Sequence, residues 1–97
     1  MSGSPSPTIV LYTKPGCGLC DEAREALEAL LAERRSTGRP SAAVEERDIL
    51  TNPEWERAFA FEIPVVELGD RRLLLATSPA RLRRLLADAL DGAPAPI

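Results

Sequence analysis

The pair Cys17 and Cys20 constrains this chain most, because it stands between an apolar run and a helical pattern. Residues 8–14, before the pair, are rich in apolar and β-branched residues and are followed by Pro-Gly, which predicts a buried strand. In residues 21–33, after the pair, alanine and leucine recur at spacings of three and four, which predicts a helix with one core face. We therefore expect the two cysteines at the junction of a strand and a helix.

The spacing of the two cysteines permits a disulfide that opens and closes in place. Residues three apart on a helix have Cβ atoms about 5–6 Å apart, and a disulfide needs Cα atoms about 4.4–6.8 Å apart. As a structural staple, so short a loop would contribute only roughly 2 kcal/mol. We therefore expect the cysteines to be reactive rather than structural.

The position of Cys17 near the start of the helix favours it as the nucleophile. Free N–H groups and the positive end of the helix dipole stabilise a thiolate, and Lys14, the only lysine of the chain, adds a positive charge nearby. Asp21 and Glu22 place negative charge in the same turn and oppose this effect. We expect a lowered thiol pKa for Cys17, with Cys20, one turn inside the helix, as the resolving thiol.

The rest of the chain alternates strand and helix signals. Residues 42–49 fit a short strand, an Asn-Pro pair at 52–53 begins a helix, a Gly-Asp pair at 69–70 joins two strands, and a Ser-Pro pair at 78–79 begins the last helix. The predicted order is β-α-β-α-β-β-α, with a parallel first unit and an antiparallel late hairpin. This order predicts an α/β domain in which helices flank both faces of a four-stranded mixed sheet.

Composition limits the function further. The 97 residues suit one domain, placed at residues 8–90 between a flexible leader (1–7) and a flexible tail (91–97). The leader lacks the features of a secretory signal and no apolar stretch approaches the ~20 residues of a membrane span, which predicts a cytoplasmic protein. A net charge of −3 without long charge runs argues against nucleic-acid and membrane partners. The absence of histidine excludes Cys-His and Ser-His catalysis and His-ligated zinc.

Two groups of conspicuous side chains are expected to be structural. The four aromatic residues are expected in the core, and three arginines of the last helix on a solvated face. These residues are Tyr12, Trp55, Phe59 and Phe61, and Arg81, Arg83 and Arg84.

The chain resembles a glutaredoxin-like protein of the thioredoxin superfamily over about residues 8–90. The resemblance is carried by VLYTKPGCGLC, the helix after it, VEERDI, and EIPVVEL with its hairpin and last helix. It implies a thioredoxin-like (glutaredoxin-type) fold and a thiol-disulfide oxidoreductase serving electron transport and cell redox homeostasis. It also implies that Pro64 is cis and packs opposite the cysteines, that Ile63 offers backbone hydrogen bonds to the bound thiol partner, and that Lys14 contacts glutathione.

Two departures from the family leave the substrate open. Typical dithiol glutaredoxins carry Pro and an aromatic between the cysteines, whereas this chain has Gly18 and Leu19, which loosens the turn and removes an aromatic wall. The family's glutathione site also uses a Gly-Gly pair and an Asp near the start of the last helix, where this chain has Ser78 and Pro79. The expected substrate-binding residues are Lys14, Gly18, Leu19, Ile63 and Pro64.

The expected partners follow from this chemistry. We expect a monomer that reacts with a protein disulfide or with a small thiol such as glutathione, which is a candidate cosubstrate. A thiol or a flavoprotein would reset the dithiol. No bound cofactor is expected, and no metal site, because two thiolates do not complete the four-coordinate sphere of structural zinc. The alternative is a non-catalytic thioredoxin-fold module that binds a partner or a bridging iron–sulfur cluster, as in some glutaredoxin relatives.

Overall fold

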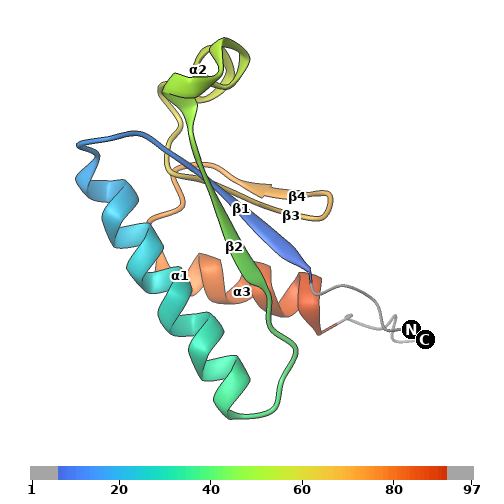
Figure 1. Cartoon of the computed structure of the whole chain (residues 1–97). Helices are drawn as coiled ribbons and strands as arrows, with labels where there is room; N and C mark the ends of the chain where they lie inside the picture. Colours follow the sequence, from blue (N-terminus) through green and yellow to red (C-terminus); the bar gives the residue numbers. More distant parts are fainter. Residues whose placement is uncertain (1–6, 92–97) are drawn as a thin grey trace.

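The computed structural model describes residues 7–91, which form an α/β domain with a single four-stranded sheet (Figure 1). Most of the expected leader and tail lies outside the described residues. The elements are β1 (Thr8–Thr13), α1 (Gly18–Ser36), β2 (Ala43–Asp48), a short 3-10 turn η1 (Ile49–Thr51), α2 (Pro53–Phe59), β3 (Val65–Leu68), β4 (Arg71–Leu73) and α3 (Pro79–Leu90). The observed order is the predicted β-α-β-α-β-β-α.

The sheet has the order β2-β1-β3-β4 and mixed pairing. β1 pairs with β2 in parallel, from Thr8 opposite Ala43 to Thr13 opposite Asp48. β3 runs antiparallel to both β1 and β4, so the first unit is parallel and the late hairpin antiparallel, as predicted. β1 is an inner strand with a neighbour on each side. Its carboxyl end, after which the cysteines follow, is therefore held by the sheet.

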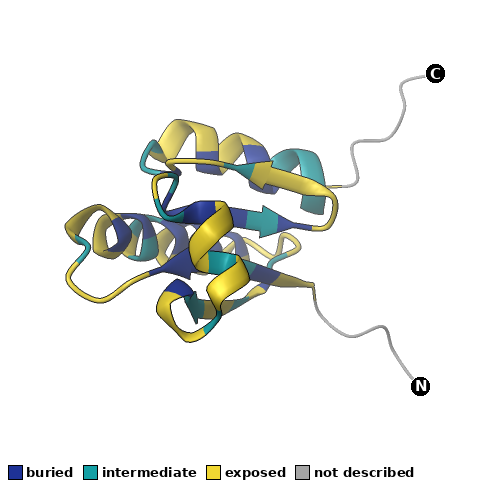
Figure 2. Cartoon of the chain, turned by 90° about the horizontal axis from the view of Figure 1, so that it is seen from above, coloured by how far each residue is buried: buried dark blue, intermediate teal, exposed yellow. Residues whose placement is uncertain are grey.

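The larger core cluster joins the sheet to α1 and α3, which contact each other beside the strands (Figure 1). Successive strand residues point to opposite faces, so Ile9 and Leu11 point to the same side and are fully buried there. They belong to one cluster with Leu27 of α1 and Leu82 of α3. The leucine spacings that predicted these two helices therefore mark their buried faces, while the outer faces are exposed (Figure 2). Arg81, Arg83 and Arg84 lie on the exposed face of α3, as expected.

The second core cluster lies on the other side of the sheet, under α2. Tyr12 of β1 packs against two side chains of α2, with its ring centroid 5.7 Å from that of Trp55 and 4.5 Å from that of Phe59. Cys20 and Ile63 belong to the same cluster. Three of the four aromatic residues therefore pack in or against the core, as expected.

The fourth aromatic residue corrects an expectation. Phe61 is 92% exposed, although Phe59, two positions earlier, is buried. α2 ends at Phe59, and the N–H groups of Glu62 and Ile63 both donate to the Phe59 carbonyl oxygen, at 2.8 and 3.2 Å. This tight turn redirects the chain after the helix, and the side chain of Phe61 is left in solvent.

α1 begins at Gly18, so that Cys17 is its N-cap residue and Cys20 lies in its first turn, as predicted. One element boundary differs from the sequence pattern. β4 ends at Leu73, although the apolar run continues to Ala76. The N–H of Ala76 donates to the Pro64 carbonyl oxygen at 2.8 Å, so this segment pairs with the chain before β3 instead of extending the hairpin. Of the helices in residues 7–91, none has the length and apolar content needed to cross a bilayer.

Candidate active site

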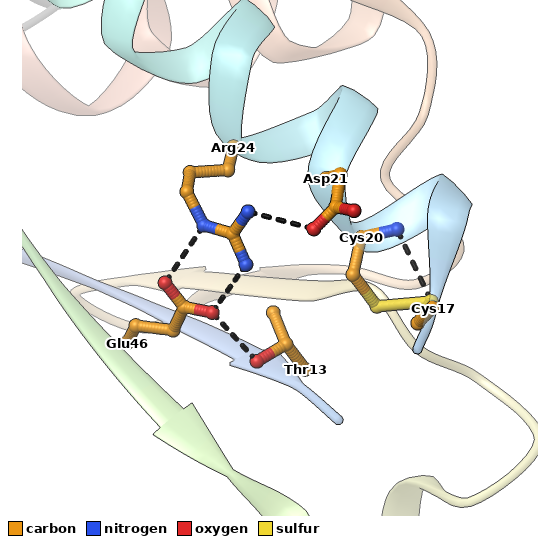
Figure 3. The surroundings of a disulfide bond; sticks show 6 residues. All are labelled: Thr13, Cys17, Cys20, Asp21, Arg24 and Glu46. Carbon is orange, nitrogen blue, oxygen red and sulfur yellow. Dashed lines mark hydrogen bonds and ion pairs between the residues drawn. A yellow bond between two sulfur atoms is a disulfide. The ribbon is translucent and has the colours of Figure 1, made fainter. Parts of the chain in front are cut away.

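The two cysteines form a disulfide at the start of α1 (Figure 3). Cys17 is the N-cap residue, with extended backbone angles, and its Sγ accepts a hydrogen bond from the Cys20 N–H at 3.1 Å. Oxygen side chains usually make this contact at a helix start, and here a sulfur does so. The Cα atoms are 5.2 Å apart, within the range expected from the spacing.

The two sulfurs differ in their access to solvent. Cys17 is half-buried, whereas Cys20 has no exposed surface and lies in the core cluster under α2. A reactant therefore reaches Cys17 first. The roles of Cys17 as nucleophile and Cys20 as resolving thiol stay predictions.

A polar network lies beside the disulfide and joins α1 to the two parallel strands (Figure 3). Arg24 of α1 donates to Asp21 at 2.8 Å and to Glu46 of β2 at 2.8 and 2.5 Å. The buried hydroxyl of Thr13, at the end of β1, donates to Glu46 at 2.9 Å. The network therefore fixes the first turns of α1 over the carboxyl end of β1.

The charges of this network stabilise one another. The hydrogen bonds from Arg24 hold the pKa of the Glu46 carboxyl below its usual value, although burial acts in the opposite direction. The hydrogen bond to Glu46 makes the largest contribution to raising the pKa of Arg24, and the hydrogen bond to Asp21 makes the second largest. Asp21 is thus paired with the guanidinium of Arg24. This pairing reduces the repulsion between the Asp21 carboxylate and a Cys17 thiolate.

The Ile63–Pro64 peptide bond is cis, as the family resemblance implies. Ile63 belongs to the core cluster that contains Cys20 and against which Cys17 packs. Its N–H donates to the Phe59 carbonyl oxygen at 3.2 Å, while in residues 7–91 no donor is placed on its own carbonyl oxygen. Of the two backbone polar groups of Ile63, only the N–H is therefore engaged within residues 7–91.

The remaining predicted site residues lie near the start of α1. Lys14 is exposed after β1 and lines a shallow cavity of ≈ 180 Å³ together with Pro15, Gly16 and the polar network. Gly18 is the first helical residue and has open space around the position of a side chain. Leu19 is 50% exposed. In the part of the chain that the structure describes, no group of three or more His, Cys, Asp or Glu side chains is placed to hold a metal ion.

Sequence reasoning missed the polar network. Asp21 and Arg24 are three apart on a helix, which is a pairing signal that sequence offers. The link to Glu46 depends on the packing of α1 against β2, for which the sequence carries no local signal.

A C-x-x-C disulfide at the junction of β1 and α1, packed with a cis-proline loop, defines the thioredoxin-like class of proteins. The chain belongs to the glutaredoxin-like domain family (DUF836), which matches residues 8–90. A structural genomics target protein from X. campestris, solved by X-ray crystallography, is 30% identical, with a TM-score of 0.65 over 89% of this chain and 99% of that one. A malarial protein of 15% identity has the same fold, with a TM-score of 0.60 over 89% of this chain and 99% of its own.

Proposed function

We propose that the protein is a thiol-disulfide oxidoreductase that uses the Cys17–Cys20 pair as a reversible dithiol. The observation that carries this proposal is the asymmetry of the pair. Cys17 is accessible and sits at the N-cap of α1 with an N–H donor on its sulfur, while Cys20 is buried within disulfide distance behind it. A helix start stabilises a negative sulfur, which is the form that attacks disulfides.

The reaction transfers two electrons from the dithiol to a substrate disulfide. The Cys17 thiolate attacks one substrate sulfur, the substrate S–S bond breaks, and the other substrate sulfur leaves as a thiolate. Cys20 then gives its proton to solvent and attacks the Sγ of Cys17. The mixed disulfide breaks, the second substrate thiolate is released, and the Cys17–Cys20 disulfide remains. An external thiol or flavoprotein reductant returns the two electrons.

The surroundings of the disulfide supply groups for binding the substrate. The carbonyl oxygen of Ile63 has no donor in the described residues, and it would accept a backbone N–H of a bound partner. Pro64 follows Ile63 through the cis peptide bond, Gly18 and Leu19 stand between the cysteines in the chain, and the exposed Lys14 offers a positive charge. A protein disulfide or a small mixed disulfide fits these groups.

The start of α3 offers little to a glutathione carboxylate. Pro79 has no N–H, and the N–H of Arg81 is already bonded to the Ser78 hydroxyl at 3.2 Å. The N–H of Thr77 donates to the Leu75 carbonyl oxygen at 2.8 Å. Three of the backbone groups that could bind an anion here are thus absent or engaged, which favours a protein over glutathione as substrate.

The test is to change Cys20 to Ser, so that the mixed disulfide on Cys17 is not resolved, and to identify the attached group by mass. We expect a covalent adduct that dithiothreitol releases and that is absent from the Cys17→Ser variant. In parallel, the wild-type protein should reduce a protein disulfide while Cys17→Ser does not. Equal rates for wild type and Cys17→Ser would overturn the proposal.

The alternative is a module without turnover that binds a partner or a bridging iron–sulfur cluster. Nothing in residues 7–91 favours it, and the visible absorption spectrum of anaerobically purified protein tests the cluster directly. The cytoplasmic location and the monomeric state expected from the sequence stay predictions.

A further inference from the structure

Three large apolar side chains are exposed on the first turn of α1, on the chain just before the cis-proline, and on the segment that is hydrogen-bonded to that chain. They are Leu19 between the cysteines (50% exposed), Phe61 (92%) and Leu75 (51%). Phe61 lies two residues before Ile63, which shares a core cluster with Cys20. The N–H of Leu75 donates to the Glu62 carbonyl oxygen at 2.9 Å, which holds it beside the same loop. We call these three side chains the apolar rim.

Leu75 is held in a backbone conformation that glycine adopts more easily. Its φ is 49°, in the left-handed region, where residues with a Cβ are strained. Hydrogen bonds to the cis-proline loop, from Leu75 to Glu62 and from Ala76 to Pro64, maintain this conformation. A leucine that is strained yet half exposed contributes little to the core. Strain of this kind concentrates at functional surfaces, which indicates that the side chain serves a contact outside the molecule.

We propose that the apolar rim binds apolar side chains next to the cysteine of a polypeptide substrate, so that this protein acts on protein disulfides and not on glutathione. The inference rests on the proposed function, because a substrate at this surface must carry a disulfide for Cys17 to attack. Exposed apolar patches mark interaction sites, and aromatic side chains are frequent anchors within them. Glutathione has two carboxylates and no large apolar side chain, so it would cover none of the rim.

The test compares three probes on the Cys20→Ser protein. Each probe is a mixed disulfide with 5-thio-2-nitrobenzoate: a hexapeptide whose cysteine is flanked by Leu and Phe, a hexapeptide whose cysteine is flanked by Ser and Gly, and glutathione. The Cys17 thiolate attacks the probe sulfur, the probe S–S bond breaks, and the coloured nitrobenzoate thiolate leaves with the electron pair. Its absorbance gives the rate, which is divided by the rate of the same probe with free N-acetylcysteine.

We expect the apolar peptide to react roughly tenfold faster than the other two probes, the factor expected from partial burial of a large apolar side chain. Adding Phe61→Ser or Leu75→Asn should lower this preference several-fold, since asparagine tolerates the left-handed conformation but is polar. Adding Arg84→Ser, at an exposed position of α3, should leave the preference unchanged. Thermal unfolding of each variant confirms that it is folded.

The outcomes separate the inference from the proposed function. Equal rates for the three probes, or a preference for glutathione, with Cys17 still reacting, would overturn the inference and leave the oxidoreductase in place. A preference that survives both rim substitutions would overturn it as well. No reaction of Cys17 above that of free thiol with any probe would contradict the proposed function, and the inference with it.

Discussion

The guanidinium of Arg24 donates two hydrogen bonds to the carboxylate of Glu46, from Nε at 2.8 Å and from Nη2 at 2.5 Å. Arg24 lies on the second turn of α1 and Glu46 on the edge strand β2, so this pair crosses from the helix that carries the cysteines to the sheet. Thr13 binds the same carboxylate from β1. The position of the disulfide over the end of β1 therefore depends on a tertiary contact as well as on the local strand-to-helix junction.

Glu46→Gln should destabilise the protein in a pH-dependent way. The pair is partly exposed, so we expect a cost of only about 0.5–1 kcal/mol at pH 7. The folded-state pKa of Glu46 is held below its ordinary value of 4.5, so the stabilisation is present above that pH and is lost as the pH falls through the folded value. Urea unfolding of both proteins at pH 7 and pH 3 measures the difference in their free energy of unfolding at each pH. Glu28→Gln, an exposed position on α1, is the control, and an equal cost at both pH values would contradict the prediction.

Gly18→Pro should stabilise the protein. Gly18 is the first helical residue, where proline is favoured, and the preceding Cys17 has φ −95° and ψ 105°, which a following proline tolerates. No atom lies within 4 Å of a Cβ at this position. We expect a gain of about 0.5–1 kcal/mol and a rise of roughly 4 °C in the unfolding midpoint. Gly16→Ala, at φ 78°, should instead lower stability by about 1 kcal/mol, and a gain there would count against this account.

The reduced cysteines should differ in reactivity. Because Cys17 is partly exposed at a helix start and Cys20 is fully buried, iodoacetamide should modify Cys17 at least roughly tenfold faster. The rates are measured by intact mass in the single-cysteine variants Cys20→Ser and Cys17→Ser. In guanidinium chloride the two rates should converge, since the difference is one of folded structure. Faster modification of Cys20 in the folded protein would reverse the assigned roles.

Substitutions of two phenylalanines two positions apart should differ strongly in their effect on stability. Phe59→Ala removes a buried ring that packs on Tyr12 and should cost about 3–5 kcal/mol. Phe61→Ala removes an exposed ring and should change the free energy of unfolding by no more than about 0.5 kcal/mol. Chemical denaturation of both variants gives the comparison. A large loss with Phe61→Ala would show that its ring packs in the core.

Much of the fold could be predicted because its signals are local. The leucines of α1 and α3 recur at helical spacing, and their buried faces in the structure are the predicted ones. The Asn, Ser and Cys side chains that cap the helices each accept N–H bonds from the first turn, which involves only neighbouring residues. Gly69, at φ 64°, makes the tight hairpin that its sequence predicted.

The features that could not be predicted depend on contacts between distant segments. Phe61 was expected in the core because it is aromatic, but the turn after α2 directs it outward. By its local pattern the apolar run after β4 would continue the strand, but hydrogen bonds from Leu75 to Glu62 and from Ala76 to Pro64 take it out of the sheet. Local hydrophobicity does not distinguish a side chain that is buried in its own fold from one that is left in solvent.

The sequence by itself determined the order of strands and helices, the mixed sheet and the position of Cys17 and Cys20 at a strand-to-helix junction, because periodicity, caps and turn residues act over a few positions. Only the tertiary structure decided which sulfur is accessible, which groups surround the disulfide and which apolar side chains remain outside the core. Burial and the Arg24–Glu46 contact arise when segments far apart in the chain pack together, and no local pattern encodes that packing.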